Sequence, residues 1–235
     1  PLDVIEGISL EELLDKRTSG LFNEKQKNNV VKKTKRDFPD GIKEYGADAL
    51  RFNFCAMAST GRDINFDLKR IEGYRNFCNK IWNATRLIIM SCKDFEYQEN
   101  LNTTNATIFD KWILYKLDSV VSDFKKYTTT YRFDLMANSI YDFVWNEYCD
   151  WYLEFAKNNM NETTKNHLIF SIIRIIKLCH PIIPFITEDI WKELYSMKFV
   201  SEPMLINSSF PSQIRISKEY DITSRVEGIK SVIKR

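Results

Sequence analysis

The chain has 235 residues, and its 34 Lys and Arg nearly balance its 32 Asp and Glu, so the formal net charge is only +2. Its content of 44% hydrophobic and 28% charged residues is ordinary for a globular protein and excludes a disordered tail. The 7 Gly and 6 Pro argue against a β-sandwich or barrel, and the absence of an 18-residue apolar run excludes a membrane-spanning helix.

The first 40 residues are polar. Ser9 and Glu12 have the spacing of a capping box, which predicts a short helix over Leu10–Lys16. Residues 16–36 contain eight Lys and Arg against one acid, Glu24. This basic stretch is either a solvated helical insertion or a surface that contacts phosphates.

Two helices are predicted between residues 46 and 91. The first is compact, covers residues 46–59 and ends at a break at Thr60-Gly61. The second is a long amphipathic helix over residues 67–91. Its predicted apolar face consists of Ile71, Tyr74, Cys78, Ile81, Trp82, Thr85 and Ile89. Its opposite face carries Lys69, Asn76, Lys80, Asn83 and Leu87.

The rest of the chain predicts a helical bundle. Residues 92–106 form a polar linker, and residues 107–200 contain four apolar-patterned helices with short connections, which favours an antiparallel bundle. The tail, residues 201–235, is expected to be extended and then to start a polar helix. The predicted fold class is therefore mainly α, and both chain ends are expected to be cuts in a longer protein.

Motifs for catalysis are missing. The sequence has no glycine-rich phosphate loop, no G-x-S-x-G and no H-E-x-x-H, and its five Cys include no C-x-x-C pair. His167 is expected to be exposed, and His180 is expected to stabilise a helix C-terminus. We therefore expect no catalytic residue, no metal ion and no cofactor in this chain, and the cysteine usage favours a reducing cytoplasm.

Four segments carry a resemblance to a known family. Residues 46–52 (GADALRF) resemble a segment of several class I aminoacyl-tRNA synthetases. The longer run at residues 59–86 (STGRDINFDLKRIEGYRNFCNKIWNATR) resembles the bacterial valyl-tRNA synthetase family. Residues 142–154 (DFVWNEYCDWYLE) and 180–191 (HPIIPFITEDIW) resemble the anticodon-binding bundle of the same family. An isoleucyl- or leucyl-type fragment, and a helical interaction module without RNA binding, are the alternatives.

This resemblance implies a parent enzyme larger than the chain. The parent would be a monomeric cytoplasmic ligase that joins L-valine to its tRNA with ATP. Its catalytic and editing domains would lie upstream and a coiled coil downstream. The chain itself would hold a stem-contact region (1–91), an anticodon-binding bundle (107–200) and a tail (201–235), and would be inactive alone.

The resemblance also implies where tRNA is contacted. Lys69 and Lys80 are eleven residues apart, about 16 Å along a helix, which suits contacts to RNA phosphates. Asn76 and Asn83 can donate or accept hydrogen bonds on the same face, and Arg86 lies about a quarter-turn away.

Two apolar residues of the implied site have two interpretations each. Leu87 either makes flat apolar contact with a base or packs against the bundle. Leu153 is predicted on a polar helix face, where with Glu154 it either bounds a base pocket or packs on a neighbouring helix. Residues 107–195 hold 10 Lys and Arg against 12 acids. We therefore expect nonspecific affinity to come mainly from the stem-contact region and base discrimination from the groove between its long helix and the bundle.

Overall fold

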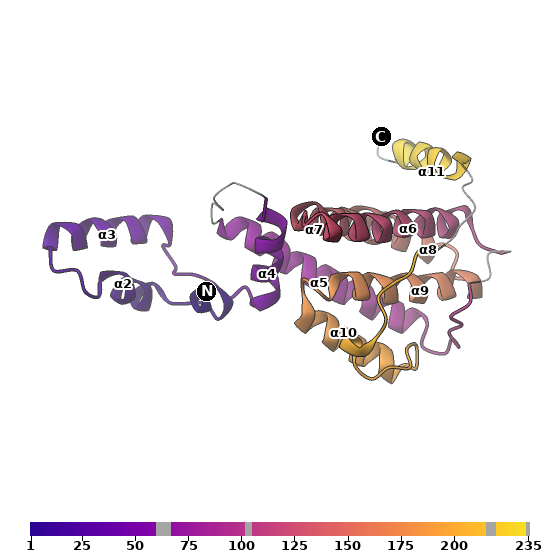
Figure 1. Cartoon of the computed structure of the whole chain (residues 1–235), viewed down its shortest axis with the longest axis horizontal. Coiled ribbons are helices and arrows are strands. Elements are labelled where there is room, and N and C mark those ends of the chain that lie inside the picture. The colour runs from indigo at the N-terminus through magenta and orange to yellow at the C-terminus, as the bar shows by residue number, and fades with distance from the viewer. Residues whose placement is uncertain (60–66, 102–104, 215–219, 234–235) are drawn as a thin grey trace.

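The computed structural model describes residues 1–59, 67–101, 105–214 and 220–233, and these form helices joined mostly by short loops (Figure 1). The predicted break at Thr60-Gly61 lies outside the described residues. The described residues contain no β-strand, only an isolated antiparallel bridge between Ile8 and Ile42, so the mainly α prediction is confirmed. The elements are α1 Leu2–Ile5, α2 Leu10–Thr18, α3 Glu24–Asp37, α4 Ala47–Met57, α5 Leu68–Ser91, α6 Ile108–Thr129, α7 Phe133–Asp142, η1 Phe143–Tyr152, α8 Leu153–Lys157, α9 Glu162–Cys179, α10 Pro184–Ser196, η2 Leu205–Asn207 and α11 Tyr220–Ile233.

Helices α2 and α3 form an arm, residues 10–37, that projects away from the rest of the molecule (Figure 1). The predicted capping box is present, since the Ser9 side chain accepts from the Glu12 amide and the Glu12 side chain accepts from the Ser9 amide. Within these two helices only Leu13 and Thr34 are buried. The arm therefore has almost no core of its own.

Helix α5 connects the arm side of the molecule to the bundle. It begins after Asp67, whose side chain accepts from the Lys69 amide at 2.9 Å, as the predicted range requires. It packs on α4, η1, α9 and α10. Its buried side is rotated from the predicted apolar face, because Phe77 and Ile88 are buried whereas Trp82 is 38% exposed.

The bundle consists of α6, the continuous α7–η1–α8 helix, α9 and α10. Its core is rich in large side chains, of which Trp112, Trp191, Tyr148 and Tyr152 are fully buried. A buried carboxylate joins three of the elements, because Asp110 on α6 accepts from the Tyr152 hydroxyl at 2.7 Å and from the Thr164 hydroxyl at 3.1 Å.

The two histidines both have structural positions. His180 follows the last residue of α9, as predicted, and its Nδ1 lies 2.8 Å from the Thr187 hydroxyl. The expectation of an exposed His167 is wrong. Its side chain is fully buried, and its Nδ1 lies 2.7 Å from the Thr163 carbonyl oxygen. The apolar side of α9 extends further toward its N-terminus than the polar neighbours of His167 suggest.

The helix that carries Leu153 departs from α-helical geometry. Residues 143–152 form the π-helix η1, in which each amide bonds the carbonyl five residues back, so a turn holds more residues than an α-turn. Side chains after η1 therefore rotate away from the face that an α-helical pattern assigns to them. Leu153 is 6% exposed and belongs to the main core, so its predicted place on a polar face is wrong.

Two charged residues of α4 hold the turn between α9 and α10. Asp48 accepts from the amides of Phe185 at 3.3 Å and Ile186 at 2.7 Å, and so caps the first turn of α10. Arg51 donates to the carbonyls of Pro181 and Ile182 at 3.1 and 2.9 Å. These bonds connect the two segments 46–52 and 180–191 that carry the family resemblance, and they fix α4 against the bundle.

We expect Asp48→Ala to lower the free energy of unfolding by about 1–2 kcal/mol, because it leaves two amides of α10 without a partner. Asp48→Asn keeps an acceptor oxygen. Burial raises the pKa of Asp48, so the neutral amide also avoids the cost of a desolvated charge. Urea unfolding should place the Asn variant closer to the wild type, and equal losses for the two variants would contradict the capping role.

The helix at the end of the tail packs against the bundle. Helix α11 packs on α6, with Val226 fully buried and Lys230 6% exposed. The Lys230 ammonium bonds Glu147 at 2.7 Å and lies 5.1 Å from the Trp112 ring centre and 5.5 Å from that of Trp151. A segment that is polar in sequence can pack here because its lysine is paired with a carboxylate and two aromatic rings.

Candidate nucleic-acid interface

Four of the predicted contact residues lie exposed along α5. Lys69, Asn76, Asn83 and Arg86 are all solvent-exposed, and no side-chain hydrogen bond or ion pair holds them among the residues that the structure describes. We call these four residues the α5 crest. Because their side chains are free, they can bind RNA groups without first breaking a protein contact.

Lys80 differs from the crest residues because the bundle already holds its charge. Its side chain is 24% exposed, forms an ion pair with Asp150 of η1, and places the ammonium 3.9 Å from the centre of the Trp145 ring. A phosphate would have to displace Asp150 to bind this ammonium. The sequence predicts two equivalent lysines on this face, but in the structure Lys69 is free whereas Lys80 is paired.

The predicted apolar contacts are mostly packing residues. Leu87 is partly buried and packs against the main core, and Leu153 lies within it. Glu154 is exposed, and its carboxylate is paired with Lys157 at 2.5 Å. Because the Leu153 side chain is buried, only backbone groups beside it are left to form the predicted base pocket, and their contact with RNA stays a prediction.

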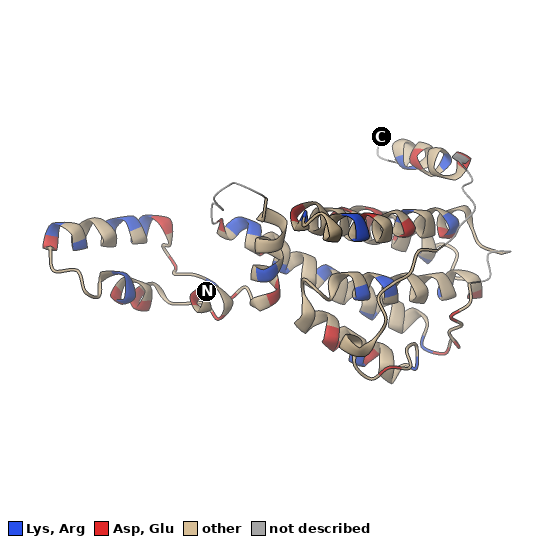
Figure 2. Cartoon of the chain, viewed as in Figure 1, with Lys and Arg blue, Asp and Glu red and all other residues tan. Residues whose placement is uncertain are grey.

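The basic stretch of residues 16–36 is mostly in the arm's second helix. Figure 2 shows Lys and Arg along α3 with acids only toward its ends. Lys25, Lys32 and Arg36 are exposed and follow each other by seven and four residues, so they project from one side of the helix. The buried Thr34 marks the other side. We call these three residues the α3 stripe.

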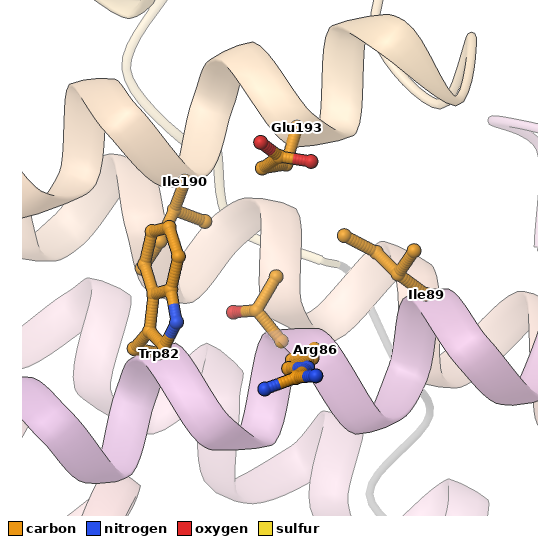
Figure 3. Close-up of a pocket in the computed structure, with 6 residues that line it drawn as sticks. Trp82, Arg86, Ile89, Ile190 and Glu193 are labelled. Carbon is orange, nitrogen blue, oxygen red and sulfur yellow. The ribbon is translucent and has the colours of Figure 1, made fainter.

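A cleft lies between α5 and α10, on one side of the predicted groove between the long helix and the bundle, and Arg86 is the one predicted contact residue in its lining. Its cavity of about 240 Å³ is lined by Trp82, Thr85, Arg86, Ile89, Ile190 and Glu193. Figure 3 shows Trp82 and Ile89 at its two ends, with Arg86 and Glu193 on opposite helices. An adjoining cavity of about 400 Å³ shares Trp82 and reaches Arg75, Asn79 and Phe185. The sequence feature that could have indicated this cleft is Trp82, which lies at the edge of the predicted apolar face and is followed four residues later by Arg86.

Burial affects the acidity of the cysteine thiols in the described residues. Burial raises the pKa of Cys78 and Cys149 to about 12 and that of Cys55 and Cys92 to about 11, so these four thiols stay protonated at neutral pH and are poor nucleophiles. In the described ranges, no three His, Cys, Asp or Glu side chains are grouped to hold a metal ion. None of the described helices has the length and apolar composition needed to cross a bilayer.

Comparison with known families identifies the class of the bundle. A family model described as the anticodon-binding domain of tRNA ligase matches residues 110–234, more than half of the chain. The chain therefore belongs to this family of anticodon-binding domains. The match begins in α6 and includes α11, which agrees with the packing of α11 on the bundle.

Comparison with individual relatives is more specific than the match to the family model. Valine--tRNA ligase of Francisella tularensis is 46% identical over 99% of the chain, and those of Legionella pneumophila strain Lens and Psychrobacter arcticus are 42% and 40% identical over all of it. These relatives confirm the resemblance to valyl-tRNA synthetases. The chain spans about a quarter of their length, since it covers 26% of each.

A solved structure shares the fold. It is a LeuRS of Agrobacterium radiobacter K84 in a ternary complex with tRNA and LeuAMS. The match has a TM-score of 0.56 and covers 81% of this chain and 26% of that one, at 14% sequence identity. At this identity the likeness shows a common architecture only.

Proposed function

We propose that the chain is the tRNA-binding portion of a valine--tRNA ligase, a monomeric cytoplasmic enzyme that joins L-valine to its tRNA with ATP. The observation that carries the proposal is the 40–46% identity to valine--tRNA ligases over 99–100% of the chain. In this proposal the chain binds tRNA, while binding of valine and ATP and the chemical steps belong to the remainder of the parent.

Two surfaces divide the work of binding. Lys25 and Lys32 of the α3 stripe, together with Lys69, supply positive charge without acidic partners, which suits phosphate contacts that do not depend on sequence. Arg36 of the stripe is paired with the adjacent Asp37 at 2.9 Å. Asn76 and Asn83 of the α5 crest present amides, which can donate to and accept from base edges. The proposal places base discrimination on the bundle side, where Lys80 is paired with η1 and α8 carries Glu154.

Filter binding tests the proposal. At low salt we expect the chain to retain tRNA for valine more strongly than tRNA for isoleucine, and to lose this preference when the middle anticodon base of the valine tRNA is changed. A preference for the isoleucine or leucine tRNA would assign the chain to one of those enzymes. Absent or equal retention of all tRNAs would instead favour a helical interaction module.

A further inference from the structure

The α5–α10 cleft contains two opposite charges that do not pair. Arg86 and Glu193 line the same cavity from different helices, yet they form no ion pair within 4.0 Å and no other described group binds either side-chain charge. Elsewhere on α10 the carboxylate of Asp189 is paired with Lys192 at 2.7 Å. The cleft therefore presents a free cation and a free carboxylate across a space that can hold a ligand.

The walls of the cleft favour a flat ring. Trp82 is 38% exposed at one end of the cavity, next to Ile190, and Ile89 lines the other end (Figure 3). An exposed indole stacks nucleic-acid bases, whatever their sequence, because every base has a π-face. The adjoining cavity continues past Trp82, where the Nε atom of Arg75 is buried without a hydrogen-bond partner. A short strand can therefore extend beyond the stacked base.

The charges indicate which base fits. Glu193 is a pure acceptor when ionised, so it favours a base edge that carries donors. The Watson–Crick edge of guanine has two adjacent N–H groups, which can bond both oxygens of one carboxylate, whereas adenine and uracil offer a single donor position there. Arg86 is suited to the phosphate of the same nucleotide.

We propose that the α5–α10 cleft binds an unpaired guanine nucleotide of RNA, with the base on Trp82, its donor edge on Glu193 and its phosphate on Arg86. This site lies on the α10 side of α5, whereas Lys80 and Asp150 lie on the η1 side. The proposal rests on the proposed function, since it assumes that RNA reaches α5.

Binding of labelled pentaribonucleotides tests the proposal. Fluorescence anisotropy at low salt should show that the whole chain binds UUGUU about tenfold more tightly than UUAUU, UUCUU or UUUUU. Trp82→Ala should weaken binding of UUGUU about tenfold, while Trp82→Phe keeps a ring and most of the affinity. Glu193→Gln should reduce the preference for guanine over adenine to about twofold or less.

Matched controls keep the test decisive. Glu162→Gln makes the same change at an exposed acid on α9 and should leave the guanine preference unchanged. The proposal is wrong if guanine is not preferred, or if Trp82→Ala binds UUGUU as the wild type does. Retention of valine tRNA without a guanine preference overturns this site alone, whereas loss of tRNA retention overturns the proposed function.

Discussion

Replacing Leu153 with alanine is expected to lower the free energy of unfolding by about 2–5 kcal/mol. Leu153 is 6% exposed and lies in the main core at the end of η1. Truncation removes buried methyl groups and leaves a cavity that close-packed neighbours fill only in part. Urea or thermal unfolding of the purified chain measures the loss directly.

A matched leucine distinguishes packing from RNA contact. Leu87 is only partly buried, so Leu87→Ala should cost clearly less stability than Leu153→Ala. Below its unfolding midpoint, Leu153→Ala should bind tRNA as the wild type does. A variant that keeps its stability but loses tRNA affinity would show that Leu153 reaches the RNA after all.

Neutralising the α3 stripe is expected to have the largest effect on tRNA affinity. The triple variant Lys25→Ala, Lys32→Ala and Arg36→Ala removes three exposed cations, of which only Arg36 has an acidic partner, Asp37 at 2.9 Å. Each phosphate contact contributes about 0.7 to 0.9 to the slope of log affinity against log salt, so the slope should flatten by up to about 2.7. Affinity should fall for valine and isoleucine tRNAs alike, because phosphates carry no sequence information.

The control removes the same charge from outside the arm. Lys93, Lys125 and Lys126 are exposed and lie away from the arm, so their alanine triple variant should change the salt slope much less. Equal slopes for the two triple variants would mean that only net charge matters. An unchanged slope for the α3 variant would make the basic stretch a solvated insertion, the other interpretation of this sequence.

Local sequence patterns predicted the helices correctly where local physics dominates. The capping box at Ser9 forms as predicted, because the bonded groups are only three residues apart. The range of α5 is also correct, because a 24-residue amphipathic pattern over-determines a helix. The exposure of Lys69, Asn76, Asn83 and Arg86 follows from the same pattern.

The errors arise where side-chain direction depends on more than an α-helical period. The π-helix η1 changes the register before Leu153, and no residue type in the segment marks this change. Lys80 looks like a free cation in sequence, yet Asp150, seventy residues later, pairs with it. A helical wheel cannot include such a partner, because it describes one helix without its neighbours.

The amino-acid sequence by itself determined the helical class, the family resemblance and the polar crest of α5, because these depend on local patterns that survive without long-range contacts. Only the tertiary structure decided which of the predicted side chains are free to bind. Asp48 caps a helix more than a hundred residues away, α11 buries Lys230 between two tryptophans, and the cleft at Trp82 exists only where α5 and α10 meet. Each outcome depends on a partner that is distant in the chain, and a local sequence pattern does not show which distant residues lie close in space.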